Sequence, residues 1–293
     1  MLRWFRFITL SALVVFMQHQ SEAASLKVSP AQFIVHHVEP GKLYDIHEKT
    51  GLRFTIFNDD EVPRTWTLTT HRPSERGRWE KGYGEIPDAK WCWFAEDEIT
   101  VEPNGRAFAY LKIQIPPGDQ YYNQHWIMTV HISGGGTGSV GVAINIRVQI
   151  ETKSSADTIS RSAGLLGMRP STVSFEEVDP GTTREASVML FNNDTVAHTY
   201  RVSPLFDDEA IKRKRYVTQA FSAIPDSGWL GRNEIVRIEA GGTGALRLKL
   251  DVPDDPAHYG KKWEDMVLIQ PDKGLPEFVR VQVETTTGPD AID

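Results

Sequence analysis

The 293-residue sequence contains a single cysteine, Cys92. One thiol cannot form an internal disulfide, so the fold must be held together by apolar cores. Within the aromatic segment 91–94, the cysteine fits either a buried small hydrophobic residue or a reactive thiol that pairs with another molecule. We favour the buried residue, because free cysteine is among the most frequently buried residue types.

The chain also lacks an excess of positive charge. Its 32 Lys and Arg residues are outnumbered by 39 Asp and Glu residues, which gives a net charge of −7. Nucleic-acid binding needs a dense basic face, so nucleic acid is not expected as a partner. The one basic run, 212–215, fits a solvated loop or a contact with an anionic polymer or lipid headgroup. We favour the solvated loop and keep Lys212 and Arg213 as candidate partner-binding residues.

Motifs that carry catalysis are missing as well. The sequence has no nucleophile elbow, no phosphate-binding loop and no dinucleotide fingerprint. His36 and His37 are adjacent on an expected strand and therefore point to opposite faces, which argues against one shared metal ion. Acidic clusters such as 59–61 lack the spacing of a calcium loop and are better explained as turns. The sequence therefore predicts a protein that is not an enzyme and that has no metal site and no cofactor.

The N-terminus holds the one long apolar run. Arg3 and Arg6 precede an apolar stretch over 7–17, and a polar stretch then ends in small residues at Ala23 and Ala24. This order is typical of a secretory signal peptide over residues 1–24. A membrane anchor is the alternative, but it needs about 20 consecutive apolar residues. We therefore expect an exported protein, located in the periplasm or secreted.

The chain repeats itself. The segment 57–66 matches 191–200, the segment 86–91 matches 224–229, and the segment 147–152 matches 280–285. The offset between the copies is 140 residues at Pro30 and Pro170, and 134 residues at Asn58 and Asn192. Several blocks in one order, with drifting offsets, indicate a tandem duplication with loop insertions.

The duplication assigns roles to several residues. Cys92 aligns with Leu230, which supports the buried interpretation of the cysteine. Large aromatic residues that recur in both copies are expected in the cores, because the copies share a fold but need not share a ligand. These recurring aromatic residues are Trp91, Trp126, Trp229 and Trp263.

Short segments of alternating apolar and polar residues, separated by turn residues, dominate both copies. The longest alternation runs from Val140 to Ile150 and follows a glycine-rich loop. This pattern is typical of half-buried strands in a sandwich. We predict an all-β chain of two tandem immunoglobulin-like β-sandwich domains related by internal duplication. Domain 1 covers 25–152, a linker 153–167, domain 2 168–287, and a tail 288–293.

The order of these segments resembles the PapD-like group of bacterial immunoglobulin-like domains, which includes periplasmic pilus-assembly chaperones. The similarity rests on Pro30, on Pro40 and Gly41, on the segments 57–59, 99–103 and 110–116, and on the alternating strand after Val140. The resemblance implies that this strand, through Val142, Ile144 and Ile146, supplies a missing strand to a partner subunit. It also implies basic residues for the partner's carboxylate, for which Lys112 and Lys27 are the matching positions.

Two functions follow from these features. The first is an exported, non-enzymatic structural or protein-binding module, and the alternative is a periplasmic pilus-assembly chaperone that donates a β-strand to a subunit. The chaperone function requires Val142, Ile144 and Ile146 to lie on an exposed sheet edge. Trp79 lies in a charged loop with no counterpart in domain 2, and we expect it to contact a partner. In both cases the expected partner is another protein, a surface or pilus-type component.

Overall fold

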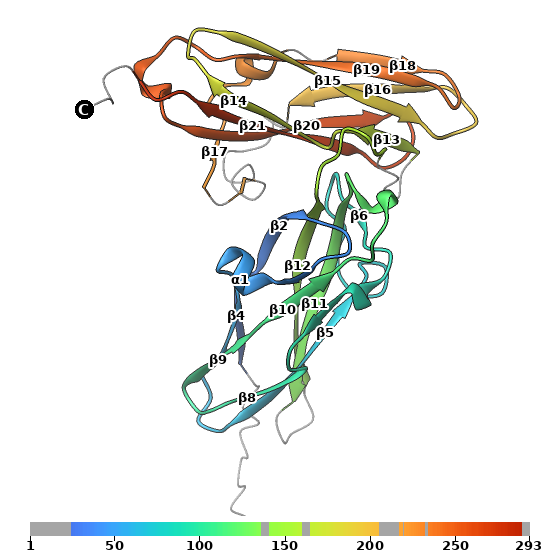
Figure 1. The fold of residues 1–293 in the computed structure, drawn as a ribbon. Helices are drawn as coiled ribbons and strands as arrows, with labels where there is room; N and C mark the ends of the chain where they lie inside the picture. The colour runs from blue at the N-terminus through green and yellow to red at the C-terminus, as the bar shows by residue number, and fades with distance from the viewer. Residues whose placement is uncertain are drawn as a thin grey trace, which may run out of the picture.

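The computed structural model describes residues 25–135, 141–159, 165–204, 217–218, 220–231 and 234–288. These residues form two β-sandwiches in tandem (Figure 1). In Figure 1, domain 1 stands below, coloured blue to green, and domain 2 lies across its upper end, coloured yellow to red. None of the described helices is long and apolar enough to cross a membrane. The predicted signal peptide lies outside the described residues.

Domain 1 is built of two facing layers. One layer is a six-stranded sheet in the order β2-β12-β11-β5-β8, with β6 beside β11, and the other consists of the sheets β1-β4-β9 and β3-β10-β7. The strands are β1 (Leu26–Ser29), β2 (Gln32–Val38), β3 (Leu43–Asp45), β4 (Phe54–Asn58), β5 (Arg64–His71), β6 (Gly84–Glu85), β7 (Cys92–Phe94), β8 (Glu98–Val101), β9 (Gly105–Ala109), β10 (Leu111–Gln114), β11 (His125–Gly135) and β12 (Gly141–Thr152).

Domain 2 repeats this arrangement. Its six-stranded sheet has the order β14-β21-β20-β16-β18, with β17 beside β20, and it faces the sheet β13-β15-β19. The strands are β13 (Leu166–Arg169), β14 (Thr172–Val178), β15 (Thr183–Asn192), β16 (His198–Pro204), β17 (Ser222–Ala223), β18 (Glu234–Ile238), β19 (Thr243–Asp251), β20 (Lys262–Pro271) and β21 (Glu277–Thr285). The predicted fold class, two tandem immunoglobulin-like sandwiches, is confirmed.

The two domains differ at helix α1 (Ile46–Thr50), which the sequence analysis did not predict. It lies where the offset between the copies falls from 140 to 134 residues, so domain 1 carries six additional residues there. The Asp45 side chain caps the helix by accepting a hydrogen bond from the His47 backbone N–H at 2.9 Å. Gly51, at φ 74°, ends it in the left-handed conformation that favours glycine. A five-residue helix is too short to show a helical apolar period.

The recurring tryptophans form a matching pair in each core. Trp91 and Trp126 have ring centroids 5.6 Å apart, and so do Trp229 and Trp263. Trp126 and Trp229 are buried as predicted, whereas Trp91 and Trp263 are half-buried and pack against the core from its margin. Cys92 is fully buried, which confirms its assignment to the core. Burial raises the pKa of its thiol, and so does the nearby charge of Asp88.

Equivalent turns in the two domains carry different ion pairs. In domain 1, after β4, Arg64 Nε lies 2.6 Å from Asp60 Oδ2. In domain 2, His198 replaces the arginine, and its ring lies between Asp194, at 2.8 Å, and Asp272, at 2.6 Å. Hydrogen bonds donated by its ring to Asp194 and then Asp272 raise the pKa of His198 above its ordinary 6.5. The domain 2 pair therefore contains a histidine, whose charge depends on pH, where domain 1 has an arginine.

We expect the stability of domain 2 to fall as the pH rises. Because the folded pKa of His198 is raised, the charged pair contributes fully below an unfolded pKa of about 6.5 and is lost as the pH passes through the folded value. His198→Arg, which copies domain 1, should remove this part of the pH dependence. Thermal unfolding at pH 5.5 and pH 8.5 measures it. An equal pH dependence in wild type and variant would contradict the assignment, and Arg64→His should introduce the dependence into domain 1.

Candidate functional site: the domain junction and the open edge of β12

An apolar cluster from both domains forms the first part of the junction. Tyr83 and Ile127 of domain 1 pack with Met266, Leu268 and Phe278 of domain 2. The Phe278 ring also lies flat on the ring of His125, with centroids 3.8 Å apart and an interplanar angle of 7°. Residues far apart in the sequence therefore meet in one desolvated contact between the sheets.

Gly82 makes this contact possible. It has φ +85°, and a Cβ atom at this position would lie 2.6 Å from the Phe278 ring. A side chain here would therefore both strain the backbone and push the two domains apart.

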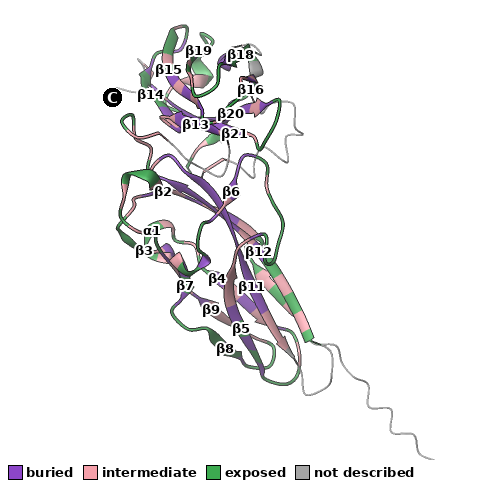
Figure 2. Cartoon of the chain, turned by 90° about the vertical axis from the view of Figure 1, so that its right-hand side faces the viewer, coloured by how far each residue is buried: buried purple, intermediate pink, exposed green. Residues whose placement is uncertain are grey.

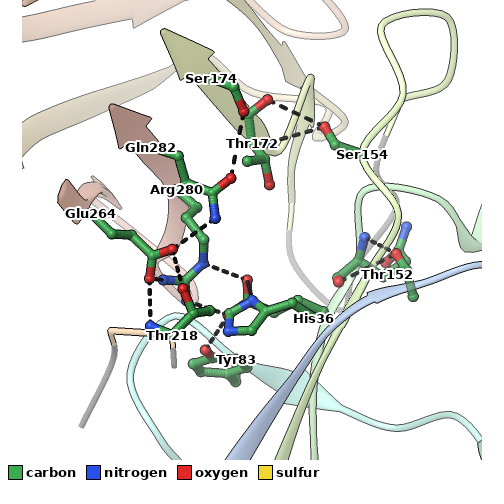
Figure 3. Close-up of polar contacts among 12 residues, drawn as sticks. His36, Tyr83, Thr152, Ser154, Thr172, Ser174, Thr218, Glu264, Arg280 and Gln282 are labelled. Carbon is green, nitrogen blue, oxygen red and sulfur yellow. Dashed lines mark hydrogen bonds and ion pairs between the residues drawn. The ribbon is translucent and has the colours of Figure 1, made fainter. Parts of the chain in front are cut away.

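A buried ion cluster adjoins the apolar contact (Figure 3). Arg280 of β21 donates through Nε to Glu151 Oε2 at 2.7 Å and through Nη2 to Glu151 Oε1 at 2.5 Å, which reaches β12 of domain 1. Its remaining Nη1 donates to Glu264 of β20. Arg280 is 1% exposed, so this guanidinium is held between one carboxylate from each domain.

Further donors complete both carboxylates. Glu151 accepts a hydrogen bond from the Tyr83 hydroxyl at 2.5 Å, and His36 Nδ1 lies 3.2 Å from it. Glu264 accepts from the Gln282 amide at 2.8 Å and from the Thr218 hydroxyl at 2.7 Å. Nearly every oxygen lone pair of the two carboxylates thus accepts a hydrogen bond, as a buried charge requires.

The cluster shifts the ionisation of its members strongly. Burial alone would raise the pKa of Glu151, but Arg280 and then His36 hold it well below its usual range. Burial alone would lower the pKa of Arg280, but the charges of Glu151 and Glu264 outweigh the effect of burial and raise it. Both groups are therefore charged at neutral pH, and the pair couples the two domains electrostatically.

A buried asparagine ties the start of the linker to both domains. Asn123, 1% exposed, accepts hydrogen bonds through Oδ1 from the Ser155 and Ser171 backbone N–H groups at 2.9 and 3.0 Å. Its Nδ2 donates to the Ser155 carbonyl at 2.7 Å. Described residues 153–159 of the predicted linker contain no helix, and β13 already begins at Leu166.

A cleft of about 1110 Å³ opens beside the junction. It is lined by β2 and α1 of domain 1 and by residues 217–223 of domain 2, including His36, His37 and Lys49. Among the described residues that line it there is no Asp or Glu, and Lys49 is the one Lys or Arg side chain. The Lys49 ammonium lies 4.5 Å from the centroid of the Tyr44 ring.

The basic positions implied by the resemblance do not meet in this cleft. Lys112 lies on β10, paired with Asp45 of β3 and Trp93 of β7, in the sheet of the opposite layer. Lys27 of β1 lies over the Phe57 ring at 5.1 Å from its centroid. Lys49 is the cation in the cleft instead. The only trace of it in the sequence was the change of offset that marks the α1 insertion.

The edge of β12 is open over part of its length. Antiparallel β11 pairs with β12 from Gly141 to Glu151, whereas parallel β2 joins its other side only from Arg147 onward. Among the described residues, no strand pairs with the second edge of 141–146. This end of the hairpin projects from domain 1, with alternating exposed and intermediate residues (Figure 2).

The predicted strand residues are placed differently along this edge. Val142 and Ile144 are half-buried and pack against the margin of the core, and the alternate residues Ala143 and Asn145 are exposed. Ile146 is 2% exposed and belongs to the core, so we leave it out of the accessible surface. The backbone edge that the chaperone function requires is therefore unpaired at all three residues within the described part of the chain, but the side chain is half-buried at Val142 and Ile144 and buried at Ile146.

The remaining candidates lie away from the junction core. Trp79 is 50% exposed in the loop between β5 and β6. Lys212 and Arg213 lie outside the described residues. No group of three or more His, Cys, Asp or Glu side chains that could hold a metal occurs in the described part of the chain. The described residues thus include the unpaired edge of β12 over 141–146, the cleft with Lys49 and the exposed Trp79.

No family model matches the chain, and no curated protein sequence matches it. Solved structures are similar over most of its length. A protein of unknown function from Porphyromonas gingivalis W83 is 14% identical, with 88% of this chain and 99% of that chain covered and a TM-score of 0.34. The periplasmic chaperone SfaE is 10% identical, with 88% and 99% covered and a TM-score of 0.32. The E. coli chaperone DraB is 8% identical, with 90% and 97% covered and a TM-score of 0.30.

The resemblance to PapD-like domains thus extends to solved chaperone structures. TM-scores this low carry no information about function or about the position of a site.

Proposed function

We propose that the chain is an exported, non-catalytic protein-binding module that pairs an extended segment of a partner protein with the open edge of β12. The observation that carries this proposal is that residues 141–146 are hydrogen-bonded to a neighbouring strand on one side only. An unpaired edge presents a row of backbone donors and acceptors that another strand can satisfy. Val142 and Ile144 supply the apolar face on which the partner's side chains pack.

The fixed domain junction supports the same function. The Arg280 cluster and the Phe278 contact hold domain 2 against one end of domain 1, the end that carries Tyr83 and Glu151. The open edge lies on the projecting part of β12, away from this contact (Figure 2). A partner can therefore reach the edge without separating the domains. The cleft with Lys49 offers a separate contact beside β2 for a negatively charged group of a partner.

The test is a double charge substitution at the edge. Val142→Asp with Ile144→Asp should reduce recovery of the native partner from periplasmic extract at least about tenfold, because pairing would then desolvate two carboxylates. Ala143→Asp is the matched control: it adds a charge to the same strand, but on the exposed opposite face. Recovery is measured by affinity capture and quantitative mass spectrometry. The proposal fails if the double variant, with unchanged unfolding, retains its partner.

The same capture distinguishes the two kinds of role. A stoichiometric fibre subunit would support the pilus-chaperone function, in which β12 completes the subunit's sheet. Recovery of the chain inside a surface assembly would support a structural role.

A further inference from the structure

The loop of residues 72–81, here called the Trp79 loop, is fixed to the outer face of β11 and β12. Arg76 Nη1 lies 2.9 Å from His131 Nε2, and the other ring nitrogen of His131 lies 2.7 Å from Asn145 Oδ1. Glu80 forms an ion pair with Arg147. Two anchors therefore connect this loop to β12, one at Asn145 and one at Arg147.

Gly77 makes the loop approach the sheet closely. At φ +132°, its Cα packs so near to Thr129 of β11 that a Cβ atom would lie 2.1 Å from the hydroxyl oxygen. Thr129 is fully buried under the loop. The loop is thus seated on the sheet, so its exposed side chains are presented from a rigid base.

Trp79 lies between the two anchors. Its neighbour Glu80 contacts Arg147, the first residue of β12 that pairs with β2. The loop is therefore held beside the point at which the open edge of β12 ends. Trp79 is 50% exposed on this base, and tryptophan is among the residue types enriched at the centres of protein interfaces.

The charges around Trp79 are unbalanced. The carboxylate of Glu75 pairs with Arg72, as does that of Glu85, and the carboxylate of Glu80 pairs with Arg147. In contrast, three cationic side chains have no carboxylate partner among the described residues: Arg76, Arg78 and Lys81. The loop therefore carries unpaired positive charge on both sides of Trp79 in the sequence, in a chain whose net charge is −7.

We propose that the Trp79 loop is the specificity contact for the partner segment that pairs with β12, and that it selects an acidic residue pair flanking that segment. The inference rests on the proposed function, because a strand paired with 141–146 must leave the sheet edge at Arg147, where β2 takes over the pairing and where Glu80 of the loop makes its contact. Carboxylates of the partner meet Arg78 and Lys81, while an adjacent apolar side chain covers the indole. Charge complementarity of this kind sets partner choice more than it sets total affinity.

The experiment selects binders from a displayed library of random peptides about 12 residues long, a length that spans the edge and the loop. Selection is run in parallel on the wild-type chain, on the Val142→Asp/Ile144→Asp variant, and on an Arg78→Glu/Lys81→Glu variant. The wild type should enrich peptides with alternating apolar residues followed or preceded by Asp or Glu. The Arg78→Glu/Lys81→Glu variant should enrich the alternation without the acidic pair.

Affinities of the best synthetic peptide give the second measurement. Replacing its acidic pair with Gln, or Trp79 with Ala in the protein, should each weaken binding about tenfold. Trp93→Ala is the matched control: this tryptophan is also exposed, at 37%, but lies on β7 in the opposite layer, and its loss should leave binding unchanged.

The outcomes separate the two proposals. Enrichment of alternating peptides without acidic preference would overturn the role of the Trp79 loop and leave pairing with β12 intact. Enrichment that is identical on the wild type and on the Val142→Asp/Ile144→Asp variant would overturn pairing itself.

Discussion

Replacing Arg280 with methionine should cost about 3–5 kcal/mol of stability, because the change leaves the Glu151 and Glu264 carboxylates buried without their shared counter-charge. Glu264 is fully buried and Glu151 is 3% exposed, so neither can regain its hydration without opening the junction. Urea denaturation followed by tryptophan fluorescence measures the loss. Small-angle scattering tests whether the domains separate.

The duplicated sequence supplies the control for this prediction. Arg147 is the domain 1 counterpart of Arg280, but its side chain is 29% exposed and its partner Glu80 is 19% exposed. Arg147→Met should therefore cost no more than about 1 kcal/mol. A triple variant that adds Glu151→Gln and Glu264→Gln to Arg280→Met should recover part of the loss, because no uncompensated charge remains. Equal losses for Arg280→Met and Arg147→Met would contradict the role assigned to the buried cluster.

Replacing Asn58 or Asn192 with alanine should cost about 3 kcal/mol each, because each side chain satisfies several buried backbone carbonyls. Asn58 Nδ2 donates to the carbonyls of Val62, Val101 and Glu102 at 2.8, 2.9 and 3.2 Å. Asn192 Nδ2 makes the same contacts in domain 2 with Val196, Ile238 and Glu239 at 2.7, 3.1 and 3.1 Å. Alanine removes this amide donor from a buried site; the Glu102 and Glu239 carbonyls still accept from the Gly105 and Gly242 backbone N–H groups at 3.0 and 2.9 Å.

Differential scanning calorimetry checks this pair of predictions. Asn193→Ala, at the exposed position next to Asn192, is the control and should change stability by less than about 0.5 kcal/mol. Each buried substitution should lower the transition of its own domain. Losses of very different size in the two domains would contradict the equivalence of the turns.

Much of the architecture could be predicted because it depends on local periodicity and on repetition. The alternating segments identify strands, and the matching blocks predict that Asn58 and Asn192, or Trp126 and Trp263, occupy equivalent places. Cys92 could be assigned to the core because its counterpart is Leu230. These inferences need no knowledge of how the two copies meet.

The functional surfaces could be predicted only in part. The alternation after Val140 indicates a strand, but it does not show where β2 stops covering it, so Ile146 was grouped with Val142 and Ile144 although it is buried. Lys112 matched a family position yet lies in the opposite layer, because strand order alone does not place a side chain in a cleft. Lys49 entered the cleft through a short inserted helix without any apolar period.

Strand periodicity and the duplication are visible in the order of the amino acids alone, so the sequence is sufficient to predict two β-sandwiches of equivalent topology. The roles of the matching segments 147–152 and 280–285 depend instead on how the two domains pack together. Arg147 and Arg280 align, as do Glu151 and Glu284, yet the junction uses the glutamate of the first copy and the arginine of the second. The other arginine, Arg147, pairs with Glu80, and the other glutamate, Glu284, pairs with Lys262. Equivalent segments acquire different roles because burial and counter-charge depend on which surfaces of the two domains meet. No local sequence pattern specifies which surfaces those are.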